Sequence, residues 1–166
     1  MVAVARGLDV TLELRARLAD LYCAYDDALN DGELERWPEL FTDACVYKVI
    51  PRENHEQGFP IALIYCESRD MLVDRVVALR ETALYAPRIV RRITSAACLR
   101  AIENDVLRVT ANFALFRTRP GVLDTYAGRY RLLLVPDAEH GYLVRLRRAE
   151  LVLDALRPHG KVSVIL

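Results

Sequence analysis

The strongest candidates for acid–base chemistry are two adjacent carboxylates, Asp26 and Asp27, near the end of an amphipathic segment. A carboxylate held in an apolar pocket has a raised pKa and can act as a general acid or base. Tyr22, Tyr25 or His55 could pair with such a group. The simpler interpretation, a solvated face near the C-terminal end of a helix, is the one that the sequence favours.

A metal site requires ligands that the sequence does not bring together. A non-haem iron centre uses two histidines and a carboxylate, yet His55, His140 and His159 form no local pair. No two cysteines have CxxC spacing, so zinc and redox motifs are absent. Each cysteine has apolar neighbours, which predicts buried free thiols in a reducing cytoplasm. The four cysteines are Cys23, Cys45, Cys66 and Cys98.

The charge balance excludes several classes of partner. The chain has 23 basic and 23 acidic residues and no basic run, which argues against a nucleic acid or a membrane surface. No run of about 18 apolar residues could cross a bilayer, and the first residues lack the apolar core of a signal peptide. Hydrophobic residues make up 53% of the chain. Either a rich core or an apolar surface that the monomer does not hide would explain that value.

Three long apolar-rich runs predict the sheet that would position these side chains. They are Val106–Arg117, Thr125–Val135 and Tyr142–Leu153, separated by turns rich in Pro, Gly and Asp. The first run has a period of two, which a helix cannot keep on one face. Its expected inner residues are Leu107, Val109, Ala111, Phe113 and Leu115. We therefore predict a meander of three long antiparallel strands.

The rest of the chain alternates helical and strand patterns after a loose N-terminal segment at residues 1–10. We expect an α+β fold in a single domain over residues 1–166, with a strongly curved antiparallel or mixed sheet covered by three helices to form a cone. The expected earlier elements are a helix at Leu12–Asn30, a short helix at Leu34–Phe41, a strand at Cys45–Ile50, an exposed ordered loop at Pro51–Pro60, a strand at Ile61–Cys66, a helix at Asp70–Tyr85 and a strand at Arg88–Ile102.

Arginines on or beside the predicted strands suggest a contact surface. Interleaved with apolar residues, they suit bidentate pairing across a protein interface, although ordinary outward positions would explain them equally well. Tyr126 and Tyr130 share one strand face and are more typical of a core or interface than of catalysis. The apolar end, Lys161–Leu166, is expected to dock on the sheet or on a neighbour. The arginines are Arg91, Arg92, Arg117, Arg119, Arg129, Arg131, Arg145, Arg147 and Arg148.

Several segments, in this order and spacing, match a known pattern. They are Tyr25–Asp27 through Glu35–Tyr47, Pro51–His55, Asp70–Arg75, Leu79–Thr82, Asn112–Thr118 and Gly128–Tyr130. Together they resemble the small, or β, subunit of aromatic-ring-hydroxylating (Rieske non-haem iron) dioxygenases. The resemblance covers about residues 12–166. Asn54–Gly58 followed by Glu67–Met71 is most similar to the small subunits of terephthalate dioxygenase and salicylate 5-hydroxylase.

The resemblance implies a cone like that of nuclear transport factor 2 and ketosteroid isomerase (NTF2-like or cystatin-like). It also implies no catalytic residue, cofactor or metal in this chain, because a large α subunit would carry a Rieske [2Fe–2S] cluster and a mononuclear Fe(II). Three small subunits would assemble with three large ones and be served by a reductase, acting on an aromatic carboxylate in the cytoplasm. Subunit contacts are expected at Arg52, Asn54, His55, Arg117, Arg129, Tyr130 and Arg147.

Two alternatives remain open on sequence alone. The first is a free-standing isomerase or dehydratase that uses Asp26 or Asp27 as its base. The second is a binding protein that holds a small apolar ligand in the cone.

Overall fold

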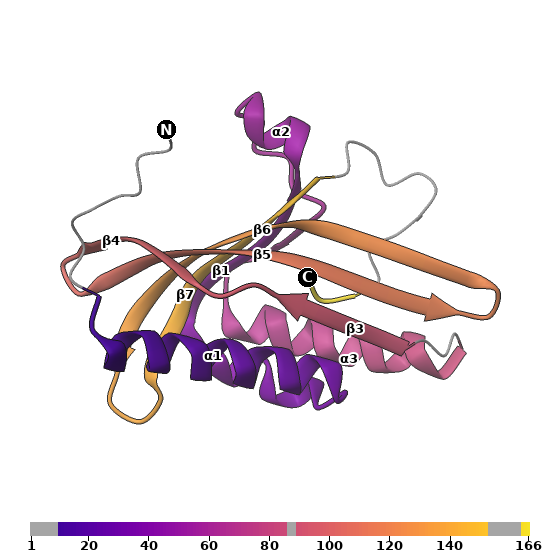
Figure 1. The fold of residues 1–166 in the computed structure, drawn as a ribbon. Helices are drawn as coiled ribbons and strands as arrows, with labels where there is room; N and C mark the ends of the chain where they lie inside the picture. The colour runs from indigo at the N-terminus through magenta and orange to yellow at the C-terminus, as the bar shows by residue number, and fades with distance from the viewer. Residues whose placement is uncertain (1–9, 86–88, 153–163) are drawn as a thin grey trace.

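A computed structural model describes residues 10–85, 89–152 and 164–166 of the chain. Two long helices lie across one face of a large sheet, and a short helix projects from the other (Figure 1). The elements are α1 (Leu12–Asn30), 3-10 turns η1 (Leu34–Arg36) and η2 (Pro38–Leu40), β1 (Phe41–Pro51), α2 (Arg52–Glu56), β2 (Ile64–Cys66), α3 (Arg69–Tyr85), β3 (Ile89–Thr94), β4 (Cys98–Glu103), β5 (Val106–Arg119), β6 (Val122–Asp137) and β7 (Gly141–Leu151).

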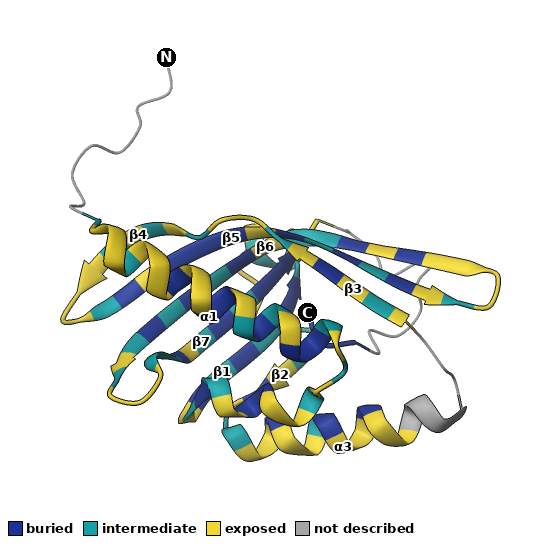
Figure 2. Ribbon diagram, turned by 60° about the horizontal axis from the view of Figure 1, so that its bottom comes forward, coloured by how far each residue is buried: buried dark blue, intermediate teal, exposed yellow. Residues whose placement is uncertain are grey.

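The sheet of the described residues is mixed and open. Its strand order is β2-β1-β7-β6-β5-β3, and β4 also pairs with β5. All these pairings are antiparallel except that of β1 with β7, which is parallel. Figure 2 shows buried and less buried positions alternating along the strands that α1 and α3 cross. The predicted α+β cone with a curved sheet is confirmed.

The long helices follow from local signals that the sequence carries. Thr11 caps α1, since its Oγ1 accepts a hydrogen bond from the Leu14 N–H at 3.1 Å. Gly32, with φ of 79°, ends it in the left-handed conformation that glycine adopts most easily. Ser68 caps α3 through a 3.3 Å bond from the Met71 N–H. On α1 the inward stripe is Leu18, Leu21, Tyr22, Tyr25, Ala28 and Leu29.

The three-strand meander is confirmed. β5 and β6 extend beyond the predicted runs, while β7 starts one residue earlier than predicted and ends at Leu151. All five predicted inner residues of β5 are buried. β4 and β5 are joined through Asn104 and Asp105, whose φ values of 50° and 62° are those of a tight hairpin turn. Long paired strands with one buried face give the large curved surface on which the helices pack.

Four predictions about local structure are wrong. The expected helix at Leu34–Phe41 is two 3-10 turns, because Pro38 starts a new turn instead of continuing a helix. The expected loop at Pro51–Pro60 contains α2. The expected single strand at Arg88–Ile102 is two strands, β3 and β4. Cys23 and Cys98 are exposed, while only Cys45 and Cys66 are buried as expected.

The break between β3 and β4 has a side-chain cause. The Ser95 N–H donates to the Asn112 carbonyl at 2.9 Å, and the Ser95 hydroxyl accepts from the Asn112 N–H at 3.0 Å. The Ser95 hydroxyl thus takes the place of a backbone carbonyl as the acceptor for the Asn112 N–H. The regular pairing of β3 with β5 ends at this point. The bend opens space against α1.

The last residues dock into the core, as expected for an apolar end. Val164, Ile165 and Leu166 are buried. The Tyr47 hydroxyl donates to the Leu166 carbonyl and accepts from the Leu166 N–H, both at 2.9 Å. Arg75 donates to the Val164 carbonyl at 2.8 Å. The expectations that concern residues 1–9, Arg88, His159 and 161–163, and the Ala83 side chain, lie outside the described residues.

Candidate functional site

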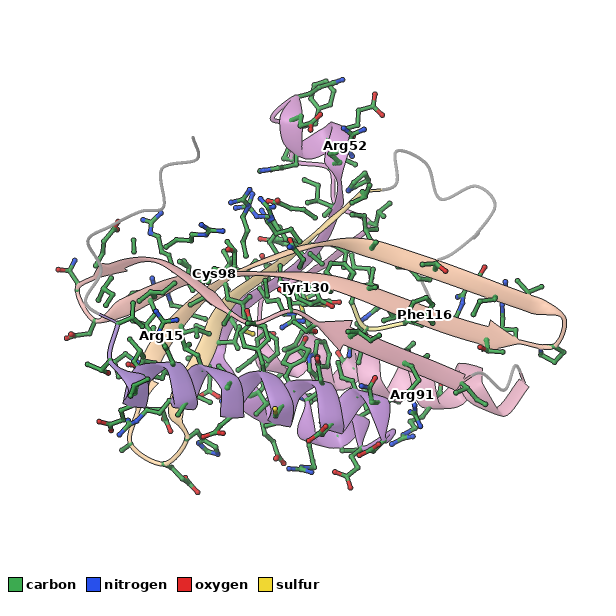
Figure 3. All side chains as sticks on the ribbon, viewed as in Figure 1. Arg15, Arg52, Arg91, Cys98, Phe116 and Tyr130 are labelled. Atoms are coloured by element: carbon green, nitrogen blue, oxygen red, sulfur yellow. The ribbon has the colours of Figure 1, made fainter. Side chains whose placement is uncertain are left out.

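The predicted contact residues divide into two groups. Arg117, Tyr130 and Arg147 are 2%, 0% and 1% exposed, so they belong to the interior of the chain and offer no surface to a partner. Arg52, Asn54, His55 and Arg129 reach the surface. Figure 3 shows the contrast, with Arg52 on the projecting α2 and Tyr130 in the layer between sheet and helices. The four residues that reach the surface remain candidates for a subunit contact, which stays a prediction.

Arg52, His55 and Arg129 line one hollow of about 430 Å³ beside α2. Pro51 is both the last residue of β1 and the N-cap of α2, so the sheet itself places the helix. Asn54 lies on α2 without lining the hollow, and its amide donates to the Ile61 carbonyl at 2.9 Å. The same side chain therefore ties α2 to the segment that follows it.

Glu150 is the centre of a polar network in this hollow. Its Oε1 lies 2.6 Å from Arg131 Nε, 3.1 Å from His55 Nε2 and 3.6 Å from Arg148 Nε. Arg148 also approaches His55 Nδ1 at 3.3 Å. The Glu150 side chain is only 10% exposed, so these contacts replace water around its charge. The network fixes α2 on the outer face of β6 and β7.

The α2 hollow carries an excess of positive charge. Three guanidinium groups, those of Arg52, Arg129 and Arg131, line it together with two carboxylates, those of Glu56 and Glu150. Arg148 adds a fourth cation behind Glu150, 3.6 Å from its Oε1. Arg129 contacts the neutral Asn112, 3.3 Å from its Nε. A hollow with this balance suits an acidic segment of a partner protein.

An apolar stripe lies next to α2 in the chain. Phe59, Ile61, Leu63 and Tyr65 are 50%, 65%, 37% and 52% exposed. Their spacing of two residues runs into β2, an edge strand of the sheet. We call these four side chains the 59–65 stripe. Large apolar side chains on an open edge are typical of a surface that another chain covers.

The two carboxylate candidates on α1, Asp26 and Asp27, lie outside the fully buried core. Asp27 is exposed, as a solvated helix face requires, and Asp26 is half-buried with no hydrogen-bond partner for its Oδ1 among the described residues. Burial raises the pKa of Tyr22 and of Tyr25, while the nearby Arg147 guanidinium opposes that rise. His55 contacts Glu150 and Arg148 beside α2, so the predicted pairing of His55 with Asp26 is wrong.

Arg147 fills the space that a catalytic pocket would need. Its guanidinium carbon lies 3.6 Å from the Tyr25 ring centre and 3.7 Å from the Tyr130 ring centre. Phe113 stacks on the other side of Tyr130 at 4.0 Å. None of the three guanidinium nitrogens has a hydrogen-bond partner within the described part of the chain. The centre of the cone is thus a packed stack of rings around a cation.

A substitution at Arg147 separates the effect of its charge from that of its volume. We expect Arg147→Met to leave the free energy of unfolding within about 1 kcal/mol of the parent, because the lost cation–π contacts and the avoided burial of charge offset one another. Arg147→Ala should lose about 2–3 kcal/mol through the cavity between the two rings. Urea denaturation followed by circular dichroism measures both. Equal losses for Met and Ala would contradict this account.

The described residues show no cluster of three His, Cys, Asp or Glu side chains that could hold a metal ion. Neither α1 nor α3, the long helices of the described ranges, has the length and hydrophobicity of a bilayer span.

A family model described as "Ring hydroxylating beta subunit" matches residues 26–157. The chain belongs to this family. It is 36% identical over 108 residues to the small subunit of anthranilate 1,2-dioxygenase from Burkholderia cepacia, which is 64% of this chain and 67% of that protein. It is 29% identical over 101 residues to a β subunit of the terminal oxygenase component of terephthalate 1,2-dioxygenase from Comamonas sp, which is 61% of this chain and 66% of that protein.

The matched segment thus spans about two-thirds of each of these two β-subunit relatives. A crystal structure assigned as the β subunit of an aromatic-ring-hydroxylating dioxygenase from Novosphingobium aromaticivorans superimposes with a TM-score of 0.78 at 32% identity, covering 91% of this chain and 95% of that one. The family and the NTF2-like fold predicted from the sequence are confirmed.

Sequence reasoning missed Glu150, which organises the α2 hollow. A signal was available, because Glu150 is an acidic residue at the end of a strand that otherwise carries Arg145, Arg147 and Arg148. Its pairing with Arg131 on β6 depends on strand register, with Arg131 opposite Arg148 and Arg129 opposite Glu150. Register cannot be read from one strand alone.

Proposed function

We propose that this chain is the non-catalytic small subunit of a Rieske aromatic-ring-hydroxylating oxygenase and supplies contact surface to the large α subunit. Membership of the β-subunit family over residues 26–157 is the observation that carries this proposal. In the proposed complex the large subunit holds a Rieske [2Fe–2S] cluster and a mononuclear Fe(II), and a reductase supplies electrons. The packed ring stack around Arg147 supports a role in shape rather than in turnover.

The proposed assembly contains three large and three small subunits, with the small subunits also in contact with one another. Its substrate is an aromatic carboxylate, since the names of the two β-subunit relatives given above contain anthranilate and terephthalate, both ring carboxylates. The complex would serve the catabolism of aromatic compounds in the cytoplasm, and residues 1–166 would act as one domain.

The surface that we assign to the large subunit combines the α2 hollow with the 59–65 stripe. The two are neighbours, because α2 carries Arg52 and His55 of the hollow and is bonded through Asn54 to Ile61 of the stripe. A centre of apolar side chains next to a charged rim is the composition of a stable interface. The excess of guanidinium groups selects an acidic segment of the large subunit, and the stripe supplies the buried apolar area.

Co-expression with a large α subunit of a ring-hydroxylating oxygenase from the same genome tests the proposal. The small chain should elute with the large subunit on a sizing column. Ile61→Asp places a charge in the stripe and should lower the recovered complex at least about tenfold, because a buried unpaired charge costs several kcal/mol. Ile93→Asp is the matched control, since Ile61 and Ile93 are 65% and 64% exposed. Ile93 lies on the edge strand β3, whereas Ile61 comes just before β2 at the opposite edge.

Ile61→Asp should reduce assembly with the large subunit, whereas Ile93→Asp should not, and both variants should fold. Circular dichroism should show both folded to the parent level. A small chain that elutes alone in the presence of its large subunit would overturn the proposed function. A larger loss of complex with Ile93→Asp than with Ile61→Asp would move the interface to the β3 edge.

A further inference from the structure

We propose that the hollow between α1 and the β3–β4 bend binds a small aromatic carboxylate. The hollow has a volume of about 580 Å³, which is within the usual range of small-molecule sites. It lies on the α1 side of the sheet, away from α2, so the inference does not depend on the proposed contact with a large subunit. Figure 3 labels Arg15 and Cys98 on its two sides.

Two elements build this hollow for local reasons. On one side, the N-terminal half of α1 turns Leu18, Ala19 and Tyr22 toward the sheet. On the other side, β3 ends where Ser95 bonds to Asn112, and the chain changes direction there. The segment from Thr94 to Arg100 then forms the opposite wall. The space is therefore a consequence of the strand break and not of a missing side chain.

Buried hydroxyl groups point to a polar ligand group. Tyr22 is 8% exposed and lines the hollow, yet its hydroxyl has no hydrogen-bond partner among the described residues. The Thr94 hydroxyl, on the opposite wall, is also buried and without a partner there. A buried polar group without a partner costs about 1–3 kcal/mol. A ligand that accepts both hydrogen bonds would offset that cost.

The charges around the hollow select an anion. Arg15 and Arg100 line it, and no carboxylate is among its lining residues. Thr110 Oγ1 accepts from Arg100 Nε at 2.8 Å, which holds that guanidinium on the wall of the hollow. Tyr22 also lies in the field of the buried Arg147 cation, which outweighs the opposing field of the Asp26 carboxylate. Hydroxyl and guanidinium groups are the hydrogen-bond donors that a carboxylate takes as partners.

The remaining walls select an apolar ring as the body of the ligand. Leu18, Ala19, Ala96, Ala97 and Leu99 line the space with small and aliphatic side chains. An aliphatic wall favours burial of a ring, while the hydroxyl and guanidinium groups orient the carboxylate. Benzoate is the simplest compound with both parts, so it serves as the probe.

Calorimetric titration of the full chain with benzoate tests the site directly. We expect binding with a Kd of about 1 mM or lower and at least tenfold weaker binding of the neutral benzamide. Tyr22→Phe, which keeps the ring and removes only the hydroxyl, should weaken benzoate at least about tenfold. Arg100→Gln should weaken it as well. The controls are Tyr65→Phe and Arg108→Gln, at exposed side chains outside the hollow.

A second readout works in any assembly that contains the chain. Cys23 and Cys98 line the hollow and are exposed, so benzoate should slow their alkylation by N-ethylmaleimide at least about threefold. Peptide mass spectrometry assigns the label to this chain, which separates the hollow from any site in a partner. Absence of binding at about 10 mM benzoate, equal binding of benzamide, or unchanged alkylation would each overturn the proposal. None of these results depends on whether a large subunit associates.

Discussion

Replacing Gly128 by alanine is expected to destabilise the chain by at least about 3 kcal/mol, a large part of the stability of a typical domain. Gly128 lies in the middle of β6, opposite Phe113 on β5 and Leu151 on β7. A Cβ at this position would be 2.0 Å from the Glu150 carbonyl oxygen and 3.0 Å from the Phe113 ring. The carbonyl belongs to a paired strand, so it cannot move without breaking the ladder. Urea denaturation, or loss of soluble protein, measures the effect.

Gly121→Ala is the matched control for that variant. Gly121 has a φ of 74° and nothing within 4 Å of an added Cβ, so the substitution meets only backbone strain. We expect a loss of about 1–2 kcal/mol. Equal losses at both glycines would show that the sheet relaxes around the Gly128 side chain, and would contradict close strand approach as the reason for glycine there.

The sequence predicted those elements whose signals are local. The alternation of Leu107, Val109 and Ala111 identified β5, and the amphipathic spacing identified the helix at Leu12–Asn30. Sequence reasoning failed where a contact between residues far apart in the chain determines the local structure. The strand ends at Thr94 because Ser95 bonds to Asn112, which is 17 residues away. α2 was missed because five residues carry too little periodicity to predict a helix.

The site shows the same division between local pattern and long-range pairing. Charge suggested that Arg147 lies at a surface, although it alternates with the buried Ala149 and Leu151 and is itself buried. The alternation was the better guide, because a side chain's face on a strand is fixed by geometry whatever its charge. Arg52, His55 and Arg129 were predicted as surface residues, but their meeting point requires β1, β6 and β7 to pair in one register. No local signal carries that information.

Asp124→Ala is expected to cost about 3–5 kcal/mol, because it removes the acidic partner of a buried arginine. Asp124 Oδ2 lies 2.7 Å from an Arg117 terminal nitrogen and 3.0 Å from one of Arg119, and the Arg117 and Asp124 side chains are 2% and 4% exposed. The Arg117 guanidinium also lies over the Tyr126 ring, 5.5 Å from its centre. Without the carboxylate, a buried cation loses this partner at the far end of β5 and β6.

The matched control for Asp124 is Glu103→Ala, which breaks an equally short ion pair in water. Glu103 and Arg108 approach at 2.8 Å, but each side chain is 57% exposed, so we expect a loss of at most about 1 kcal/mol. Urea denaturation at two salt concentrations compares them, and added salt should shrink only the Glu103 effect. Similar losses for the two variants would mean that burial adds nothing to the Arg117–Asp124 pair. A much larger loss for Asp124→Ala would show that the buried Arg117–Asp124 pair stabilises the end of the sheet, because water cannot reach Arg117 to replace the lost carboxylate.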